Sequence, residues 1–399
     1  MSDVYHFWTK GKIPSVYFGP GLVEMAHVSD EFIDLEDIHL ATKVYLDLAL
    51  RILAPTIDRA AAREAIDTNR AVTLTQTLVR FASENPPGDQ REIMDYLKGW
   101  LLERGISYET HARYEHLPCL VAKIGDVSTG PTLHFNGHTD VVPAGDGWTR
   151  EPYGAEIDGA RMYGRGTCDM KAGVAAFLTV AEYLHEQNVP LSGCFEMSLV
   201  PDEETGGDDG AGFLVEEGII KPDFAIVAEP SSMRMSITES ALLWLTFTTR
   251  GDRVHTLQSP TAVNAVENMS DVIQAIKQLR AELVHLSHPR LGGLLLTVNM
   301  VAGGIKTNVV PDDCSIEVDC RFPASLGLTI DDMLAKFDAM LERLRADNPS
   351  LDVSYTYNGK NPFRQDPNTP IIGYIKETML EVTGREAVWW RTDVEPEDE

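Results

Sequence analysis

Ionisable side chains recur along the middle of the chain, at predicted strand ends or in the turns that follow them. They are His138, Asp140, Asp169, the adjacent pair Glu203 and Glu204, and Glu229. Imidazole nitrogens and carboxylate oxygens are ligands that divalent ions such as zinc accept. A closed tetrahedral site needs only four ligands. Two ions that share a bridging carboxylate would use the whole set, so these residues favour a carboxylate-rich metal site.

Two parts of this set predict a division of roles. In a strand-like His-x-Asp the two side chains lie on one side, so Asp140 can orient the ring of His138. In an adjacent Glu-Glu pair, one carboxylate can bind a metal while the other takes a proton from water. Taken singly, His138 also fits a loop histidine, the glutamate pair a solvated surface, and Glu229 an ordinary strand end. Their joint occurrence after successive strands favours the metal site.

The elements that must position these residues indicate an α/β fold. Short apolar runs predict strands over 132–138, 195–200 and 224–229, and helical periodicity predicts helices over 71–81, 92–104 and 172–186. Strands that alternate with helices form sheets buried on both faces. Ligands of such sheets collect beyond the carboxyl ends of the strands, where the ionisable residues fall.

A second pattern begins near residue 233. It predicts a strand over 242–249, a helix over 264–283, strands over 294–301 and 315–322, a helix over 329–345 and a strand over 351–357. This βαββαβ order is that of a ferredoxin-like inserted domain. A helix over 370–382 then predicts a return to the first domain.

Composition narrows the classes of partner. The 399 residues include 61 acidic and 34 basic side chains, a formal net charge of −27 that disfavours nucleic acid and anionic membranes as partners. We find no apolar run of membrane-spanning length and no signal peptide, so we expect a soluble, cytoplasmic protein. The five cysteines are odd in number and never spaced as CxxC, which fits reduced thiols.

Four motifs carry a family resemblance. The segments 136–143, 163–173, 202–207 and 228–230 resemble the acetylornithine deacetylase / succinyl-diaminopimelate desuccinylase family of dinuclear zinc amidohydrolases, which also contains aminoacylases and glutamate carboxypeptidases. The resemblance implies a zinc-aminopeptidase-like, three-layer catalytic domain with an inserted α+β ferredoxin-like lid and dimerisation domain. It implies that one ion is held by His138, Asp169 and Glu229. Asp169 would bridge to a second ion at Glu204, and Glu203 would be the general base. Two divalent ions are therefore expected, zinc first, with cobalt or manganese as alternatives.

The family's second ion also has a histidine ligand near the carboxyl terminus, and no residue after 229 supplies it. The segment from Gly11 to Leu53 resembles the family's carboxyl-terminal segment, so His27 matches the missing ligand and Gly19 and Gly21 match substrate-binding positions. The resemblance thus implies a circular permutation. Its expected catalytic domain spans 1–232, with 1–53 as the family's usual end and 54–69 as a linker. A lid over 233–357 and a catalytic return with an acidic tail over 358–399 follow. Residues 2–4 nearly repeat residues 392–394, which leaves open whether Asp3 or Asp393 fills the family position.

The inserted domain contributes three further candidates by resemblance. His255 would reach into a neighbouring subunit and hold the developing oxyanion, while Asn308 and Arg321 would bind substrate, Arg321 by gripping a carboxylate. Spacing alone favours a surface histidine, a turn asparagine and an edge arginine. A lid-mediated homodimer predicts a partner-facing apolar stripe on helix 264–283, with Val266, Met269, Val272 and Ile276 as candidates. Packing on the lid's own sheet is the alternative.

The implied function is hydrolysis of the amide of an N-acyl amino acid, or of a similar small carboxylate-bearing amide, by metal-activated water. A metallo-dipeptidase or a glutamate carboxypeptidase acting on a short peptide is the alternative within the enzymes. It would use the same metals and the same Arg321 and differ in its pocket walls. A catalytically silent dimeric binding module is the alternative outside them. It is disfavoured because every expected metal and base residue is present.

Overall fold

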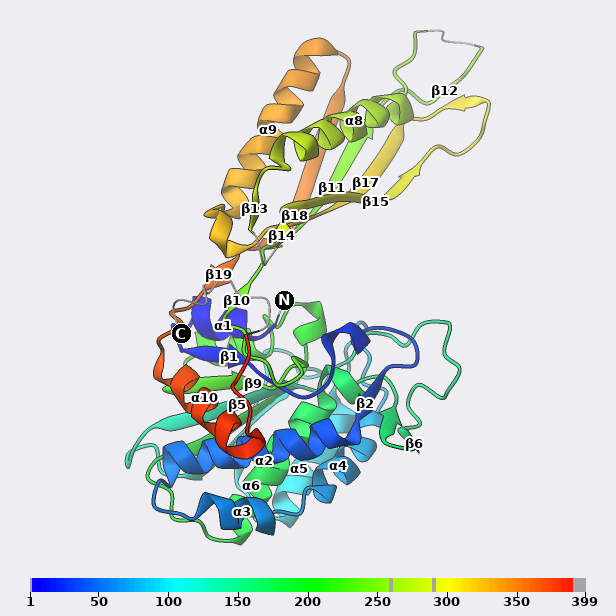
Figure 1. Ribbon diagram of the computed structural model, residues 1–399. Helices are drawn as coiled ribbons and strands as arrows, with labels where there is room; N and C mark the ends of the chain where they lie inside the picture. Colours follow the sequence, from blue (N-terminus) through cyan, green and yellow to red (C-terminus); the bar gives the residue numbers. More distant parts are fainter. Residues whose placement is uncertain (1, 258–260, 289–291, 390–399) are drawn as a thin grey trace. The chain divides into compact units, whose positions relative to one another are not determined.

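The computed structural model describes residues 2–257, 261–288 and 292–389, which form two units (Figure 1). The catalytic unit takes in the chain up to Ile237 and again from Gln365, and the lid unit runs from Thr238 to Arg364. The lid is therefore shifted from the expected 233–357. Two short strands, β10 (Thr238–Glu239) and β19 (Phe363–Arg364), pair with each other at the two ends of the lid unit, which places both boundaries there.

A six-stranded sheet forms the centre of the catalytic unit, in the order β1-β9-β5-β8-β4-β3. Its strands are β1 (Ser15–Tyr17), β3 (Tyr108–His111), β4 (Cys119–Gly125), β5 (Thr132–His138), β8 (Cys194–Val200) and β9 (Phe224–Val227). A small second sheet contains β2 (Phe32–Asp34), β6 (Glu156–Asp158) and β7 (Arg161–Tyr163). The four strands β1, β9, β5 and β8 are parallel, β4 runs antiparallel to β8, and β3 runs antiparallel to β4. Both β5 and β8 are buried throughout, as expected for strands covered on both faces.

Helices cover both faces of this sheet. They are α1 (Val4–Thr9), α2 (Leu35–Leu53), α3 (Arg59–Ala65), α4 (Asn69–Val79), α5 (Arg91–Glu103), α6 (Ala172–Glu186), α7 (Ala211–Glu216) and α10 (Pro370–Thr383). Helix α2 packs against α6, α4 and α10 (Figure 1). Phe135 of β5 contacts Tyr45 of α2 and Phe177 of α6, whereas its neighbour His134 contacts Phe7 of α1 on the opposite face. The alternation of β5 therefore produces the expected three layers.

The stretch expected to be a linker, 54–69, contains the helix α3. Its arginines Arg59 and Arg63 form ion pairs with Asp47 of α2 and with Glu381 of α10. Asp47 is fully buried. A buried carboxylate needs charged partners, so these arginines tie the stretch to α2 and α10.

The lid unit has one four-stranded antiparallel sheet in the order β15-β17-β11-β18. Its main elements are β11 (Leu242–Arg250), α8 (Ala265–Leu283), β15 (Leu295–Gly303), β17 (Asp313–Arg321), α9 (Ile330–Asp347) and β18 (Asp352–Lys360). The short pairs are β12 (Val254–His255) with β16 (Val309–Val310), and β13 (Ser287–His288) with β14 (Gly292–Gly293). The βαββαβ order and this strand arrangement are ferredoxin-like, as predicted.

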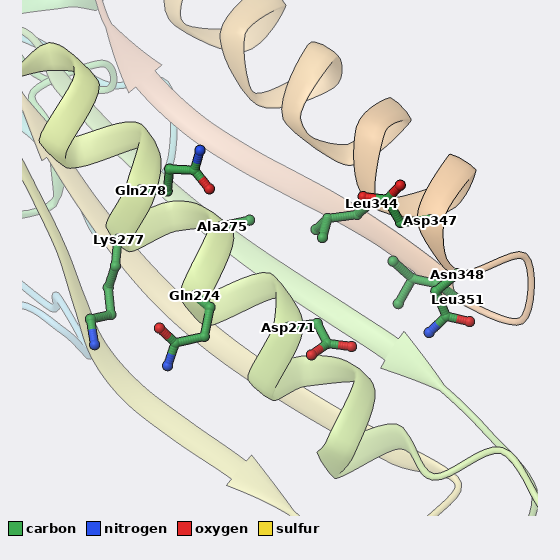
Figure 2. Close-up of a pocket in the computed structure, with 9 residues that line it drawn as sticks. All are labelled: Asp271, Gln274, Ala275, Lys277, Gln278, Leu344, Asp347, Asn348 and Leu351. Atoms are coloured by element: carbon green, nitrogen blue, oxygen red, sulfur yellow. The ribbon is translucent and has the colours of Figure 1, made fainter.

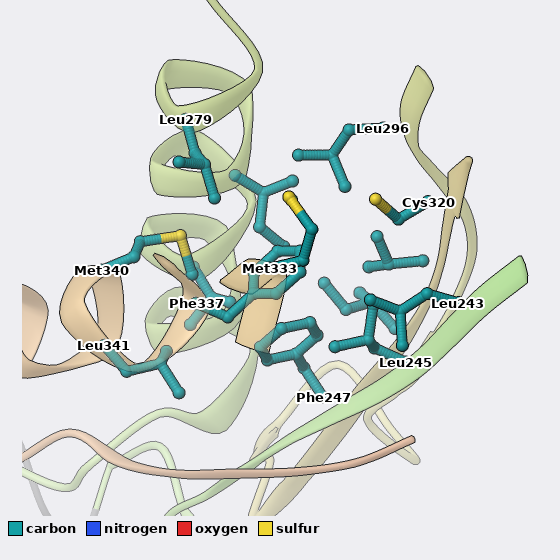
Figure 3. Packing of buried hydrophobic residues seen from close by; sticks show 14 of the residues in the cluster. Leu243, Leu245, Phe247, Leu279, Leu296, Cys320, Met333, Phe337, Met340 and Leu341 are labelled. Atoms are coloured by element: carbon teal, nitrogen blue, oxygen red, sulfur yellow. The ribbon is translucent and has the colours of Figure 1, made fainter. Parts of the chain in front are cut away.

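The lid's core lies between its sheet and its two helices. Figure 3 shows Leu243, Leu245 and Phe247 of β11 facing Met333 and Phe337 of α9. The same core takes up Met269, Val272 and Ile276 of α8, which are at most 1% exposed. The expectation that these three residues face a partner is therefore wrong, because the lid's own sheet covers them. Only Val266 of that predicted stripe is exposed.

A groove runs between α8 and α9 in the lid (Figure 2). Its lining mixes Asp271 and Asp347 with Lys277, two glutamines and a few apolar side chains, and includes no imidazole or thiol. The groove therefore lacks the ligand set that the sequence predicts for a metal centre. In the parts of the chain that the structure describes, no helix is both long enough and apolar enough to cross a lipid bilayer.

Candidate metal centre

Three parallel strands deliver candidate ligands to one edge of the central sheet. β5 ends at His138, β8 is followed by the short helix η3 (Glu203–Thr205), and β9 is followed by Glu229. Because β5 pairs in parallel with both β8 and β9, the carboxyl ends of all three strands open on the same side. The polar residues that follow these strands in the sequence therefore lie close together at this edge of the sheet.

Asp169 joins them from the start of α6. It lies in the irregular helical turn η2 (Thr167–Lys171), which leads directly into α6. Nε2 of His138 is 3.1 Å from Oδ1 of Asp169 and 3.6 Å from Oε1 of Glu229. These three side chains, which the family resemblance assigns to one ion, converge on a single point.

His27 reaches the same place from the amino-terminal segment. Strand β1 lies beside β9 in parallel, so the loop after β1 leaves the sheet at the ligand-bearing edge. Nε2 of His27 is 3.2 Å from Oδ2 of Asp169 and 3.1 Å from Oε2 of Glu204. The structure thus places His27 beside the two residues expected to share its ion, although more than a hundred residues separate it from every other candidate ligand.

The two glycines of the loop after β1 have packing reasons for their identity. A Cβ at Gly19 would lie 2.3 Å from the carbonyl oxygen of Ala228, so the loops after β1 and β9 could not approach each other. Gly21 has a φ of +85°, and a Cβ there would lie 2.7 Å from Sγ of Cys168. Both glycines therefore allow the close packing that brings His27 to the site. Their expected contact with substrate stays a prediction.

The ligand atoms fall into two groups that match a two-ion arrangement. One group is His27, Asp169 and Glu204, and the other is His138, Glu203 and Glu229, with the ligand atoms of each group within 4.8 Å of one another. Asp169 contacts the histidines of both groups, which is the position of a bridging carboxylate. Glu203, the expected base, lies within the second group rather than apart from it.

Burial makes the charges at this site strongly interdependent. Burial, followed by the charge of Asp169, raises the pKa of Glu204 to about 7, and burial also raises the pKa of Glu229 well above its usual value. Hydrogen bonding to Asp169 and then to Glu204 raises the pKa of His27 to about 11. Crowded carboxylates hold protons that they would otherwise lose, so the site favours positive charge.

The residues present fit divalent metal ions. Oε1 of Glu229 is buried and has no hydrogen-bond donor among the residues that the structure describes. Such an orphaned acceptor is costly unless a cation or water satisfies it. Carboxylate oxygens and imidazole nitrogens are the donor atoms that zinc, cobalt and manganese take. Two such ions would neutralise the four carboxylates of the site.

Asp140 supports the site differently from the expectation. Nδ1 of His138 lies 2.9 Å from the backbone carbonyl of Asp140 and 3.4 Å from its carboxylate, so the backbone makes the closer contact with the ring. The carboxylate of Asp140 instead accepts hydrogen bonds from the backbone N–H groups of Glu203 and Glu204, at 3.3 and 3.1 Å. Asp140 therefore holds the ring of His138 through its backbone carbonyl and the glutamate pair through its carboxylate.

Asn85 is a supporting residue that the sequence analysis does not identify. Its Nδ2 donates to Oδ2 of Asp140 at 3.0 Å and to Oγ1 of Thr205 at 3.1 Å. Asn85 lies in the loop between α4 and α5, and its side chain is buried. An asparagine in a proline-containing loop is an ordinary turn residue by sequence, and only its burial reveals the contact.

The candidates in the lid form two local arrangements. Nε2 of His255 is 3.3 Å from Nδ2 of Asn308, and both side chains are exposed. Nε of Arg321 donates to Oδ1 of Asp319 at 2.9 Å, and its guanidinium lies 5.9 Å from the ring of Trp244. The two terminal nitrogens of Arg321 have no hydrogen-bond acceptor among the described residues, which suits a group that would bind a carboxylate.

Comparison with known sequences gives a consistent assignment. The profile of peptidase family M20/M25/M40 matches residues 134–393. Succinyl-diaminopimelate desuccinylase 2 of Ruegeria sp. (strain TM1040) is 33% identical over 272 residues, which cover 65% of this chain and 66% of that protein. The desuccinylase of Gluconobacter oxydans (strain 621H) is 29% identical over 338 residues, covering 79% and 82%. The first alignment thus spans just under two thirds of the relative's length.

Comparison with solved structures supports the same fold. The M20 family metallo-carboxypeptidase Sso-CP2 from Sulfolobus solfataricus superposes with a TM-score of 0.65 at 18% identity, covering 81% of this chain and 85% of that one. At this identity the likeness concerns the fold alone. The fold of this chain is thus one that is found among solved structures.

Proposed function

The chain belongs to peptidase family M20/M25/M40, a family of metal-dependent amide hydrolases that bind two metal ions, and from this premise we propose its substrate. The substrate is an N-acyl amino acid or a similar small amide that carries a carboxylate, cleaved to an acid and an amine. The observation that carries the proposal is the meeting of His27, His138 and four carboxylates at the carboxyl ends of β5, β8 and β9. Zinc is the ion we propose, since the site combines two imidazoles with carboxylates.

Each residue of the site has a proposed task in hydrolysis. Bound divalent ions would lower the pKa of a water molecule and polarise the acyl oxygen of the substrate. Glu203 accepts the proton from that water and later gives it to the leaving amine. Asp140 holds the backbone of Glu203, and Asp169 holds both histidines in place. Gly19, Gly21, Asn308 and Arg321 are proposed to bind substrate, and His255 to stabilise the developing oxyanion.

A substrate screen tests this proposal. The purified chain is supplied in turn with zinc, cobalt or manganese and offered N-acetyl, N-succinyl and N-formyl amino acids and dipeptides. We expect turnover of at least one acylated amino acid. Turnover of dipeptides alone would assign the chain to the peptidase alternative. Fewer than one ion per chain after reconstitution, together with no turnover of any amide, would favour the silent binding module.

Arg321→Ala is expected to raise KM for carboxylate-bearing substrates about 10-fold or more, because a charge-assisted hydrogen bond is worth about 1.5–3 kcal/mol. An uncharged amide of the same acyl group should be affected little. Arg250→Ala is the matched control, since Arg250 is an exposed arginine of the same sheet that pairs with Asp313. If KM rose equally for the charged and the uncharged substrate, Arg321 would not act by binding the carboxylate.

We further propose that the chain is circularly permuted relative to its family. The parallel pairing of β1 with β9 and the approach of His27 to Glu204 support this proposal. So does the segment Met235–Ser236, whose two residues bridge to Trp389 and to Tyr17 respectively, so that strand β1 and the last described residue both lie beside it. The expected approach of Val4 and Val394 concerns a residue outside the described part of the chain. Residues 391–399, and with them the choice between Asp3 and Asp393, lie there too.

A lid-mediated homodimer remains part of the proposal, now without the α8 stripe. The supporting observation is β15, an edge strand of the lid sheet whose Leu295, Met300 and Val301 are exposed. An exposed apolar edge strand favours pairing with another strand. Sedimentation should show a dimer that dissociates when Met300 and Val301 are replaced by lysine. A fully active monomer would remove His255 from the proposed catalytic residues.

The proposed compartment is the cytoplasm. All five cysteines are buried and unpaired in the structure, which supports a reducing environment.

A further inference from the structure

A buried ion pair joins the two loops that supply His27 and Asp169. Nη1 of Arg165 lies 2.6 Å from Oε2 of Glu31, and the two residues are only 2% and 0% exposed. Glu31 is four residues after His27, and Arg165 is four residues before Asp169. Each member of the pair therefore belongs to a loop that carries a candidate metal ligand.

Glu31 binds the backbone of the Asp169 loop. Its Oε1 accepts hydrogen bonds from three backbone N–H groups of that loop, those of Gly166, Cys168 and Asp169, at 3.0, 2.8 and 3.2 Å. Its own carbonyl accepts a further bond from the N–H of Gly164 at 2.9 Å. One carboxylate thus fixes the loop at the residue that would bridge the two ions.

Arg165 binds the backbone of the His27 loop in return. Its Nη1 donates to the carbonyl of Val28 at 3.2 Å, and its Nη2 to that of His27 at 3.5 Å. The guanidinium lies 5.2 Å from the ring of Trp148. The loop needs this support because the His27 side chain is 52% exposed and its backbone has a φ of +65°, a left-handed conformation uncommon outside glycine.

We propose that the Glu31–Arg165 pair sets the separation between His27 and Asp169 and is the positioning pair for the ion that these residues would share with Glu204. The proposal rests on the proposed function in assuming that ion. The other group differs, since His138 is fully buried and stands at the end of a strand. Loss of the pair should therefore weaken one ion and spare the other.

Metal titration of the full-length chain tests this proposal. Zinc affinity is measured by competition with a chelator, and cobalt absorption reports the coordination of each ion. We expect Glu31→Gln to weaken one of the two ions 10- to 100-fold, the usual effect of losing an outer partner of a ligand, with the other ion unchanged. Arg165→Lys should weaken the same ion, because an ammonium group lacks the guanidinium's planar fork.

Removing one member of a buried pair leaves the other charge unpaired, so a double variant keeps the test decisive if a single variant does not fold. Glu31→Gln combined with Arg165→Gln removes both charges and should show the same selective loss. The matched control is Glu182→Gln in α6. Glu182 is a buried carboxylate that accepts from Nε of Arg104 at 2.7 Å and lies 3.1 Å from Nη1 of Arg70, and it contacts neither ligand loop.

Two results would overturn the proposal. One is unchanged binding of both ions in Glu31→Gln or in the double variant. The other is an equal loss of the same ion in Glu182→Gln, which would show that any buried ion pair of the unit acts in this way. The proposed function fails separately: a wild type that binds two ions and cleaves no amide refutes the function and leaves the positioning role intact.

Discussion

Glu203→Ala is expected to retain two metal ions and to lose turnover by about 10²- to 10⁴-fold, the usual contribution of general acid–base catalysis. Burial raises the pKa of Glu203 above its usual value, as suits a group that must both accept and release a proton. The measurement is the metal content of the purified variant after reconstitution, together with kcat on the best substrate of the screen.

The structure makes this test sharper than the sequence does. A carboxylate oxygen of Glu203 lies within 4.8 Å of the ligand atoms of His138 and Glu229, so a direct role in holding an ion is a real alternative. Glu204→Ala is the comparison, because Glu204 contacts His27 and should take an ion with it when removed. A Glu203→Ala chain that lost an ion in the same way would be missing a metal ligand, and another group would have to move the proton.

The strands and helices beside the site could be predicted because they are largely buried. The apolar run 132–138 coincides with β5, and the pattern over 172–186 coincides with α6. Strands covered on both faces favour apolar residues, and the polar residues at or just after their ends lie at the sheet's edge. That is why His138 and Glu229 can be located from the sequence.

Elements defined by pairing rather than by burial could not be predicted. Strands β10 and β19 have two residues each, too short to show a period, and they shift both lid boundaries. The sequence of helix α8 shows a single apolar stripe. Periodicity identifies the apolar face of a helix but not what packs against it, so the stripe could face either a partner or the lid's own sheet. The structure settles this for Met269, Val272 and Ile276 by burying them in the lid core.

Within the site, several of the contacts that sequence reasoning misses pass through the backbone. His138 bonds the carbonyl of Asp140, and Glu31 bonds three N–H groups of the Asp169 loop. A backbone group carries no residue type, so no motif records such a contact. His27 is the intermediate case. Its place in an irregular loop gives no periodic signal, and only the family resemblance points to it.

His27→Ala is expected to bind one ion where the wild type binds two, and to lose activity by more than about 100-fold, because loss of even an outer partner of a ligand costs up to that much. Its Nε2 lies 3.2 and 3.1 Å from Asp169 and Glu204, and in that group of three residues His27 supplies the imidazole. Metal content and kcat are measured as for Glu203. His39→Ala is the matched control, since His39 bonds Thr68 and belongs to neither ligand group, so this variant should bind both ions.

The same variant decides how the chain order should be understood. If residues 1–53 are the family's carboxyl-terminal segment, His27 supplies a ligand that no later histidine provides, and its removal must empty one position. If they are an unrelated appendage, His27→Ala keeps both ions and full activity.

A chain reopened between Ala54 and Asn69 and rejoined from Trp389 to Val4 adds the converse test. Circular rearrangement is tolerated where the joined ends lie close together, which the permutation requires of Trp389 and Val4. If the permutation is correct, this chain should therefore fold and bind two ions. Failure to bind the ion at His27 in that rearranged but folded chain would contradict the permutation.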